Sequence, residues 1–338
     1  MPILLDGGPS GFRLFAAAED LRGKSRPEFH EGDANCIDLG LVNNMPDTGL
    51  ETTERQVLKL IDAAAGDILV RLKLYSLPDV PRSELGLQHI ANHHYCSDND
   101  LLNGHLDALI VTGAEPREPD LIQEPYWSTL TQILDWAERS TLSTIWSCLA
   151  VHAAVFHFDG IARRALDSKC CGIFAFEQVS NHPMLNGAPS LFQTPHSRWN
   201  EVEEDAVASC GYSILTRSNQ AGVDIFVRQR KSLFMFFQGH PEYEAGTLLG
   251  EYRRDIGRFL RKERDIYPKV PQNYFDFEAE KVLHAFQERA LSDRRQELLA
   301  SFPHSALAAN LTDVWRDTAV QLYRNWLLYI STQKSLKS

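Results

Sequence analysis

Short apolar runs alternate along the chain with stretches in which apolar residues recur every three or four positions. The nearly continuous apolar runs predict strands at residues 36–42, 68–75, 108–111 and 143–147. The three-to-four spacing predicts helices at residues 50–65 and 128–139 and directly after Cys148. Strands that are apolar on both faces and alternate with helices are typical of a parallel sheet covered on both sides. We therefore expect an α/β fold built on a parallel sheet.

The pattern changes after residue 165. Strands are predicted at residues 174–179, 223–227 and 233–237, and residues 195–198 are predicted to lead into a polar turn. Helical periodicity returns at residues 244–261, 276–300 and 312–330. We divide the chain into an N-terminal arm (1–35), an α/β domain that carries the chemistry (36–265) and a helical C-terminal extension packed on that domain (266–338).

Composition narrows the class of protein. Apolar residues make up 43% of the 338 residues and charged residues 23%, as in soluble globular proteins. The net charge of −11 argues against a nucleic-acid surface, which needs a clustered basic face. No apolar run approaches the roughly 20 residues of a membrane span, and the first residues lack the features of a signal peptide. The six cysteines are scattered without a CxxC pair, which favours reduced thiols and a cytoplasmic location.

Cys148 stands where the apolar run 143–147 gives way to helical spacing with small residues at Ala150, Ala153 and Ala154. This pattern predicts a strand, a turn and a helix, with the thiol at the carboxyl edge of the sheet. The backbone N–H groups and the dipole at a helix N-terminus favour the thiolate, and the following amides can receive an oxyanion. The alternative is a structural cysteine, since free cysteine is among the most buried residue types.

A base for this thiol is predicted at the end of the strand 233–237. His240 and Glu242 lie there in the motif Gly239-His240-Pro241-Glu242-Tyr243, and side chains two residues apart point the same way along an extended backbone. A carboxylate that orients an imidazole, which in turn deprotonates a thiol, follows the logic of a catalytic triad. The alternative is local hydrogen bonding within a turn. Strand ends of a parallel sheet converge at one edge, and this favours the triad.

Other features of the sequence bear on metal, cofactor and ligand binding. His89, His93 and His94 lie near Cys96 in a polar stretch, but their spacing fits no common zinc pattern, and we interpret them as solvated loop residues. The phosphate-loop motifs GxxxxGK[ST] and GxGxxG do not occur. We therefore expect neither a metal nor a bound cofactor. Gly113, after the strand 108–111, permits close approach of the backbone to a ligand, unless it marks a plain tight turn.

Taken together, these residues resemble the homoserine O-acyltransferase family, whose members are O-succinyltransferases or O-acetyltransferases of methionine biosynthesis. The resemblance runs from about residue 36 to 330, and the family's fold is like that of class I glutamine amidotransferases, a flavodoxin-like arrangement. It is carried by motifs that occur in this order: Asn44-Met45-Pro46, Glu51-Thr52-Thr53-Glu54, Val111-Thr112-Gly113-Ala114, Tyr126-Trp127, Cys148-Leu149-Ala150-Val151, Lys169, Pro195-His196-Ser197-Arg198, Gly239-His240-Pro241-Glu242-Tyr243 and Glu251-Tyr252-Arg253-Arg254-Asp255.

The resemblance implies a ping-pong reaction. Cys148 would take the acyl group from acyl-CoA as a thioester, with His240 as general acid and base and Glu242 orienting it. CoA would leave before the homoserine hydroxyl attacks. Acyl-CoA would thus be a co-substrate, and no further cofactor is implied.

The resemblance also implies contacts to the substrates. Lys169 and Ser197 match substrate-contacting positions, and Arg254 matches the arginine that holds the homoserine carboxylate, a role that suits a bidentate guanidinium. The backbone at Leu149 and in the loop that ends at Pro116 would form the oxyanion hole.

The loop after Gly113 departs from the family. Three residues after the alanine, family members carry Gly with succinyl transfer or Glu with acetyl transfer, whereas this chain carries Arg117. From charge alone, Arg117 could pair with the free carboxylate of a succinyl group. Cys148-Leu149 replaces the usual Cys-Trp, Asp47-Thr48 replaces a Lys-Lys, and the charged helix at 276–300 looks like an insertion. The acceptor could therefore be another hydroxy amino acid such as serine.

The function favoured by the sequence is homoserine O-succinyltransferase, with succinyl-CoA or acetyl-CoA as donor. The alternatives are an O-acetyltransferase or serine-directed acyltransferase, a glutamine amidotransferase-like amide hydrolase with the same triad, and a pseudoenzyme that binds a metabolite or partner. Members of this family tend to form dimers, so the resemblance also predicts a homodimer. An apolar face at Trp315, Leu322 and Trp326 suits either the core or such an interface.

Overall fold

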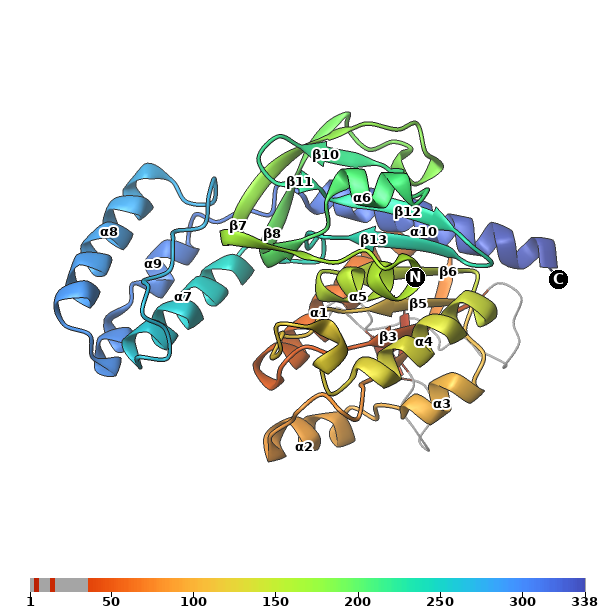
Figure 1. Ribbon diagram of the computed structural model, residues 1–338, viewed down its shortest axis with the longest axis horizontal. Coiled ribbons are helices and arrows are strands. Elements are labelled where there is room, and N and C mark those ends of the chain that lie inside the picture. The colour runs from red at the N-terminus through yellow and green to blue at the C-terminus, as the bar shows by residue number, and fades with distance from the viewer. Residues whose placement is uncertain (1–2, 6–12, 16–35, 338) are drawn as a thin grey trace, which may run out of the picture.

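The computed structural model describes residues 3–5, 13–15 and 36–337 (Figure 1). Its centre is a sheet whose five middle strands run parallel, in the order β4-β3-β5-β6-β13. These strands are β3 (Cys36–Val42), β4 (Leu69–Tyr75), β5 (Ala108–Val111), β6 (Ser143–Ser147) and β13 (Leu233–Phe237). They coincide with the apolar runs because both faces of each strand are buried. The predicted α/β class with a parallel sheet is confirmed.

Further strands extend this core at both edges. Beyond β13 lie β12 (Ile225–Gln229) and β9 (Ser213–Ile214), each antiparallel to its neighbour. At the other edge β1 (Ile3–Leu5) runs parallel to β4, and β2 (Arg13–Phe15) runs antiparallel to β1. The described pieces of the segment 1–35 are thus strands of the main sheet, and the rest of that predicted arm lies outside the described residues.

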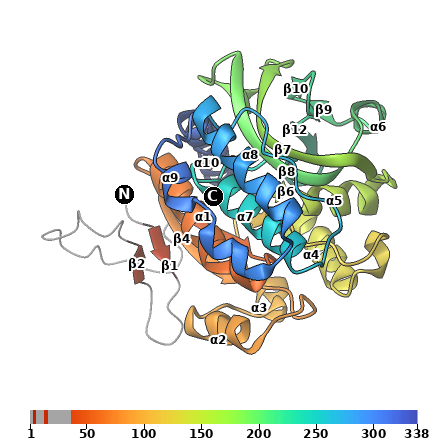
Figure 2. The ribbon, with the colours of Figure 1, turned by 90° about the vertical axis from the view of Figure 1, so that its left-hand side faces the viewer.

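Helices cover both faces of the main sheet (Figures 1 and 2). They are α1 (Leu50–Ala65), α4 (Trp127–Ser140), α5 (Leu149–Asp159) and α10 (Arg316–Lys337). On one face α1 and α10 pack against each other and share a core with Leu39 and Leu41 of β3. On the other face α4 and α5 share a core with Trp146 and Phe234. The carboxyl ends of the parallel strands are therefore held from two sides.

A second sheet is antiparallel and has the order β11-β10-β7-β8. Its strands are β7 (Arg164–Gln178), β8 (Leu191–Glu201), β10 (Thr216–Ser218) and β11 (Gly222–Val223), with the short helices η4 (Pro183–Leu185) and α6 (Glu204–Ser209) in the connections. Residues 195–198, which were predicted to lead into a turn, lie inside β8, and this strand continues to Glu201. His196 and Arg198 are buried there beside Asp224 and Glu201, partners that the local pattern does not reveal.

The polar stretch between β4 and β5 contains two short helices, α2 (Glu84–Asn92) and α3 (Asp98–Asn103). Ser83 and Ser97 cap them, since each side-chain oxygen accepts an N–H from the first turn of its helix. The interpretation of His89 as a loop residue is therefore wrong, and His93 forms the end of α2. Two further turns of 3-10 helix, η2 (Asp47–Gly49) and η3 (Leu121–Gln123), follow β3 and β5.

Residues 247–308 form a layer of their own, seen in front in Figure 2. Its helices are α7 (Thr247–Leu260), α8 (Phe277–Ser292), the 3-10 helix η5 (Gln296–Ser301) and α9 (His304–Ala308). They share a core that includes Leu249, Ile256, Leu283 and Phe286. The helix predicted at residues 276–300 is thus two helices, and α7 carries one face toward the carboxyl edge of the main sheet.

Candidate active site

Cys148 occupies a sharp turn between β6 and α5. Its backbone has φ 51° and ψ −114°, which residues other than glycine rarely adopt. The Cys148 N–H donates to the Phe237 carbonyl at 2.8 Å, so the turn is fixed to the end of the neighbouring strand β13. Strain of this kind is typical of sites where one side chain must be presented to a ligand. The predicted strand, turn and helix around Cys148 are confirmed.

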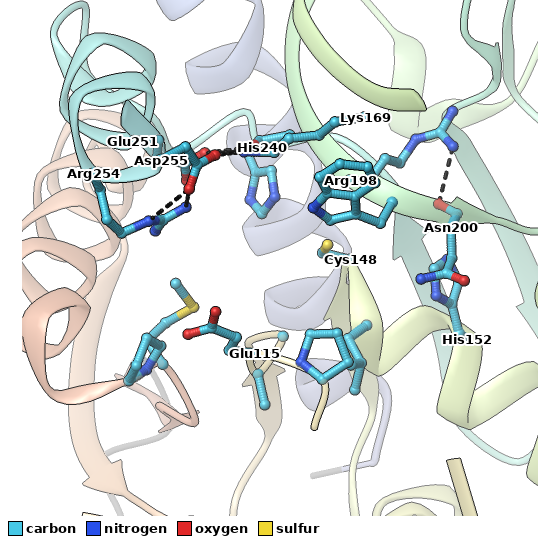
Figure 3. A pocket seen from close by; sticks show the side chains of 18 of the residues that line it. Glu115, Cys148, His152, Lys169, Arg198, Asn200, His240, Glu251, Arg254 and Asp255 are labelled. Atoms are coloured by element: carbon cyan, nitrogen blue, oxygen red, sulfur yellow. Dashed lines mark hydrogen bonds and ion pairs between the residues drawn. The ribbon is translucent and has the colours of Figure 1, made fainter. Parts of the chain in front are cut away.

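His240 follows β13 and points toward Cys148 (Figure 3). Its Nδ1 lies 2.8 Å from Oε1 of Glu242, and the ring of Tyr243 stacks on the imidazole with centroids 4.3 Å apart. The backbone N–H of His240 donates to the Pro195 carbonyl at 2.9 Å. These contacts fix the imidazole and leave Nε2 for the thiol.

The electrostatic surroundings of His240 favour its charged form. Burial by itself lowers the pKa of the imidazole, but the Glu242 carboxylate and hydrogen bonding with Cys148 raise that pKa well above its ordinary value. A protonated imidazole beside sulfur stabilises the thiolate. The arrangement therefore suits a nucleophilic Cys148.

Gly113 lets the loop after β5 close on the cysteine turn. A Cβ atom at Gly113 would lie 3.2 Å from the Leu149 nitrogen and 3.3 Å from Cys148 Cβ, so a side chain there would press the loop away. The Leu149 N–H is the first amide of α5 and has no partner within its helix. Pro116 lines the same pocket, but proline has no N–H to donate. Pro116, predicted as part of the oxyanion hole, therefore cannot supply a backbone donor.

A network of charged side chains lies between β7, β8 and α7. Lys169 Nζ is 2.9 Å from Oδ2 of Asp255 and 3.5 Å from Oε2 of Glu251, and Arg254 Nη2 is 3.2 Å from Oδ1 of Asp255. Ser197 Oγ donates to Glu251. Burial by itself raises the pKa of the Glu251 carboxyl. The positive charges of Lys169 and Arg254 oppose this effect, and the pKa lies below its ordinary value. The network thus presents charges of both signs close together, as recognition of an amino acid requires.

One pocket joins the cysteine turn, the loop after β5 and this network (Figure 3). The predicted site residues that line it are Cys148, Leu149, Pro116, Lys169, Ser197, His240 and Arg254. Its basic side chains are Arg163, Lys169, Arg198, Arg254, Arg258 and Arg264, whereas its acidic ones are Glu115, Glu251 and Asp255. Because the cations outnumber the carboxylates, the pocket suits an anionic substrate. Glu242 is not among the residues that line this pocket, and it contacts Nδ1 of His240.

Arg117 does not line the Cys148 pocket. It lines two neighbouring surface hollows, and its backbone N–H donates to Oε1 of Glu124 at 2.9 Å. Glu115, two residues earlier, lines the pocket instead and forms an ion pair with Arg258 at 2.6 Å. This pair ties the loop to α7.

Several pocket residues were missed by the sequence reasoning although α7 carries a usable signal. Glu251, Asp255 and Arg258, which were missed, share one helix face with the predicted Arg254, since side chains three and four apart on a helix are neighbours. A helix face with this much charge directly after the His240 turn indicates a site. Arg163 and Arg198 come from isolated positions with no comparable pattern.

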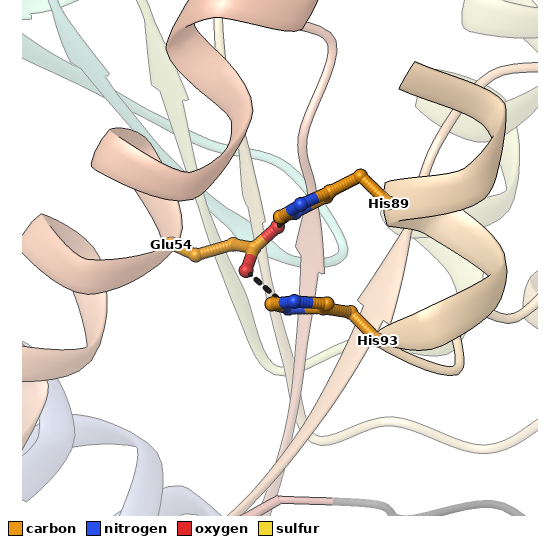
Figure 4. Close-up of side chains that lie close together, drawn as sticks. All are labelled: Glu54, His89 and His93. Atoms are coloured by element: carbon orange, nitrogen blue, oxygen red, sulfur yellow. Dashed lines mark hydrogen bonds and ion pairs between the residues drawn. The ribbon is translucent and has the colours of Figure 1, made fainter. Parts of the chain in front are cut away.

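The groups able to hold a metal ion among the described residues are Glu54, His89 and His93 (Figure 4). His89 Nε2 lies 2.5 Å and His93 Nδ1 2.9 Å from the two oxygens of Glu54, and the Tyr95 hydroxyl also donates to Glu54. Two histidines four apart on a helix with one carboxylate form a donor set that zinc accepts. In the structure the three groups satisfy one another and join α2 to α1. None of them lines the Cys148 pocket.

Comparison with known proteins identifies the family of the chain that carries this site. Residues 19–336 match the model of a family described as homoserine O-succinyltransferase. A homoserine O-succinyltransferase of Rhodopseudomonas palustris is 49% identical over 89% of this chain and 90% of its own length. One from Methylorubrum extorquens is 46% identical over 88% of each chain, and one from Bradyrhizobium japonicum is 46% identical over 87% of this chain and 90% of its own.

Among solved structures, a glutamine amido transferase from Methylobacillus flagellatus is 12% identical over 87% of this chain and 93% of its own, with a TM-score of 0.46. The α/β class rests on the sheet order of the chain itself, and nothing is drawn from this distant likeness. A cysteine at a strand-to-helix turn of an α/β fold, with a histidine and a carboxylate beside it, defines a class of thiol-dependent enzymes. By its sequence, the chain belongs to the homoserine O-succinyltransferase family and is an acyltransferase.

No helix in the described ranges, residues 3–5, 13–15 and 36–337, has the length and apolar character to cross a membrane.

Proposed function

We propose that this protein is a homoserine O-succinyltransferase that works through a thioester on Cys148. The observation that carries the proposal is the pairing of Cys148 with His240 and Glu242 in one cation-rich pocket, in a chain of this family. Succinyl-CoA is the donor and homoserine the acceptor. Both are anionic at a carboxylate, and the donor also carries phosphates, which agrees with the excess of basic side chains in the pocket.

In the first half-reaction the Cys148 thiolate attacks the thioester carbonyl of the donor. The developing oxyanion is received by the Leu149 N–H and a loop amide near Gly113. The tetrahedral intermediate then expels the CoA thiolate, which takes the proton from the His240 imidazolium. The products are free CoA, a succinyl thioester on Cys148 and a neutral His240.

In the second half-reaction the homoserine hydroxyl attacks this thioester. Neutral His240 takes the hydroxyl proton, the new ester bond forms, and the C–S bond to Cys148 breaks to return the thiolate and imidazolium. The charged network of β7, β8 and α7 holds the amino acid, with Arg254 toward the carboxylate and Glu251 toward the ammonium. Lys169 and Ser197 hold Glu251 in place.

The test is intact-protein mass spectrometry after mixing with succinyl-CoA or acetyl-CoA in the absence of acceptor. We expect a mass gain of one succinyl group in the wild type and in Cys210→Ala, a control at a free cysteine outside the pocket, but none in Cys148→Ala. Homoserine and serine are then added to discharge the adduct. Discharge by serine alone would redirect the acceptor. An acetyl adduct without a succinyl adduct would contradict the donor.

A glutamine amidotransferase-like hydrolase would use the same three residues. It would need no acyl-CoA, whereas the pocket offers six basic side chains. Hydrolysis of glutamine by a protein that gains no mass from either CoA ester would support that alternative. Full activity of Cys148→Ala would instead support a pseudoenzyme.

The homodimer and the cytoplasmic location remain predictions. Trp315, Leu322 and Trp326 are buried within one chain, so a dimer would have to use another surface. Light scattering coupled to size-exclusion chromatography measures the oligomeric state directly.

A further inference from the structure

The basic side chains of the Cys148 pocket differ in whether a carboxylate already neutralises them. Lys169 and Arg254 pair with Asp255, and Arg258 pairs with Glu115. Arg198 pairs with Glu201 at 3.3 Å. Among the described residues, no carboxylate forms an ion pair with Arg163 or Arg264. These two are the cations of the pocket that remain available to an anionic ligand.

Arg163 is held in a fixed position with one nitrogen left over. Its Nη2 donates to the carbonyls of Glu118 at 3.0 Å and Pro119 at 2.8 Å, at the end of the loop after β5. Its Nη1 is buried and has no hydrogen-bond partner within the described part of the chain. A buried guanidinium N–H without an acceptor is unfavourable. A ligand with an anionic oxygen would supply the acceptor.

A second unpartnered polar atom lies in the same pocket. His152 is one turn after Cys148 on α5, its side chain is only 3% exposed, and its Nε2 has no partner among the described residues. Burial, together with Arg198 and Arg163, lowers the pKa of this imidazole to about 3, so it is neutral at physiological pH. In Figure 3, His152 and Asn200 lie on one side of Cys148, and Arg254 lies on the other. The pocket is therefore lined on two sides of the thiol, and we call these two sides its arms.

We infer that Arg163, with His152 and Asn200 beside it, binds the distal carboxylate of the succinyl group while the group is carried on Cys148. The inference rests on the proposed function. It leaves the arm with Arg254 to the amino acid, so donor and acceptor carboxylates are bound on opposite sides of the thioester.

The length of the acyl group agrees with this arm. Side chains four residues apart on a helix are about 5–6 Å apart at Cβ, and His152 on α5 is four residues after Cys148, the residue that precedes this helix. A succinyl group places three carbon–carbon bonds of about 1.5 Å each between the thioester carbon and the carboxylate. The carboxylate can therefore extend toward the His152 side of the pocket, whereas an acetyl group ends in a methyl group one carbon beyond the thioester carbonyl and leaves Arg163 without an acceptor.

This assignment replaces Arg117 as the residue that distinguishes the two donors. The charge argument for Arg117 carries over to Arg163, but only Arg163 lines the pocket that contains the thiol. The loop that contains Arg117 contributes through the Glu118 and Pro119 carbonyls that orient Arg163.

The test compares the rates of Cys148 acylation by succinyl-CoA and by acetyl-CoA in single-turnover reactions. For Arg163→Gln we expect the ratio of the succinyl rate to the acetyl rate to fall roughly tenfold or more, since a pocket built around a polar group discriminates strongly against ligands that lack its partner. Arg164→Gln, at the neighbouring exposed arginine, should keep the wild-type ratio. His152→Phe should lower the ratio in the same direction.

The ratio is measured within each variant, so acetyl transfer reports whether Arg163→Gln has folded. If that variant loses both activities, Arg163→Lys serves in its place and should retain part of the preference for succinyl. A parallel fall with both donors would assign Arg163 to the shared CoA moiety and overturn the inference, as would an unchanged ratio. A wild type that forms no adduct on Cys148 overturns the proposed function itself and the inference with it.

Discussion

At the scale of single residues, the proton on His240 has to serve both half-reactions. Glu242 and Cys148 together raise the pKa of the imidazole against the effect of burial. Once Cys148 carries an acyl group it is neither a thiolate nor a thiol, and its share of that support disappears. The pKa of His240 should then fall, and the neutral imidazole becomes available as the base for the acceptor hydroxyl. Acylation itself thus prepares the second step.

The first prediction concerns Glu242→Gln. Removal of the carboxylate removes the largest group that raises the pKa of His240, so this pKa falls. The imidazolium form is then lost at lower pH, and the alkaline limb of the pH profile for Cys148 acylation moves toward acid. We expect the acylation rate at neutral pH to fall by roughly 10²-fold, measured by quenched mass spectrometry across pH. Glu244→Gln, two residues on, is the control. An unmoved alkaline limb would contradict the role of Glu242.

The second prediction concerns Gly113→Ala. The added methyl group would press on the Leu149 nitrogen and on Cys148 Cβ, so the loop should move away from the position of the oxyanion. We expect kcat to fall by roughly 10²-fold, the usual effect of losing one oxyanion donor, with little change in melting temperature. Gly246→Ala is a matched control, since a Cβ at Gly246 meets nothing within 4 Å. Equal kcat in the two variants would show that the loop after β5 does not contribute to catalysis.

At the scale of elements, helices bring residues from separate segments against the sheet edge. The α7 face places Arg258 against Glu115, and so fixes the loop after β5. On the other side, α2 is joined to α1 through Glu54, and Tyr95 links Glu54 to Asn43 at the end of β3. These contacts therefore stabilise the loop after β3, which includes the pocket residue Met45.

The third prediction tests this support through Glu54→Gln. Glu54 is 4% exposed and accepts hydrogen bonds from His89, His93 and Tyr95. An amide cannot accept all three, and a buried donor left without an acceptor costs about 1–3 kcal/mol. We expect the free energy of unfolding in urea to fall by that amount. Glu51→Gln, at an exposed position of the same helix, should leave it within about 0.5 kcal/mol of wild type. A neutral effect of Glu54→Gln would show that α2 is held by its apolar contacts alone.

At the scale of the whole molecule, the last helix completes the core of the first half. Leu322, Trp326, Leu327 and Ile330 of α10 are buried against the main sheet and α1. Trp326 Nε1 donates to Ser143 Oγ at 2.8 Å, at the start of the strand that leads to Cys148. The C-terminal extension is therefore part of the fold that holds the nucleophile.

The fourth prediction is that Trp326→Ala destabilises the entire protein. Truncation of a fully buried tryptophan costs about 3–5 kcal/mol, and here it also leaves Ser143 without its donor. We expect one cooperative unfolding transition at lower denaturant, with activity lost in the same transition. Leu328→Ala, on the exposed side of α10, is the control and should change little. Separate transitions for activity and for α10 would contradict this view of the extension.

The sequence by itself determined the parallel strands, the main helices and the turn at Cys148. Strands buried on both faces must be apolar throughout, and helices on a sheet must repeat their apolar residues every three to four positions. These are local requirements, and a single chain displays them. The same holds for His240 and Glu242, which are neighbours along the chain.

Only the tertiary structure decided which charged residues meet in the pocket. Lys169, Ser197 and Glu251 lie far apart in sequence, and their approach depends on the packing of β7, β8 and α7 against the sheet edge. The polar residues 195–198 are predicted to lead into a turn, whereas in the structure His196 and Arg198 meet charged partners from inside β8. Ion pairing between distant segments leaves no periodic trace in a sequence, because each partner alone has the pattern of a solvated surface residue. For the same reason charge alone favoured Arg117 as the partner of the succinyl carboxylate, whereas the fold places Arg163, and not Arg117, in the Cys148 pocket.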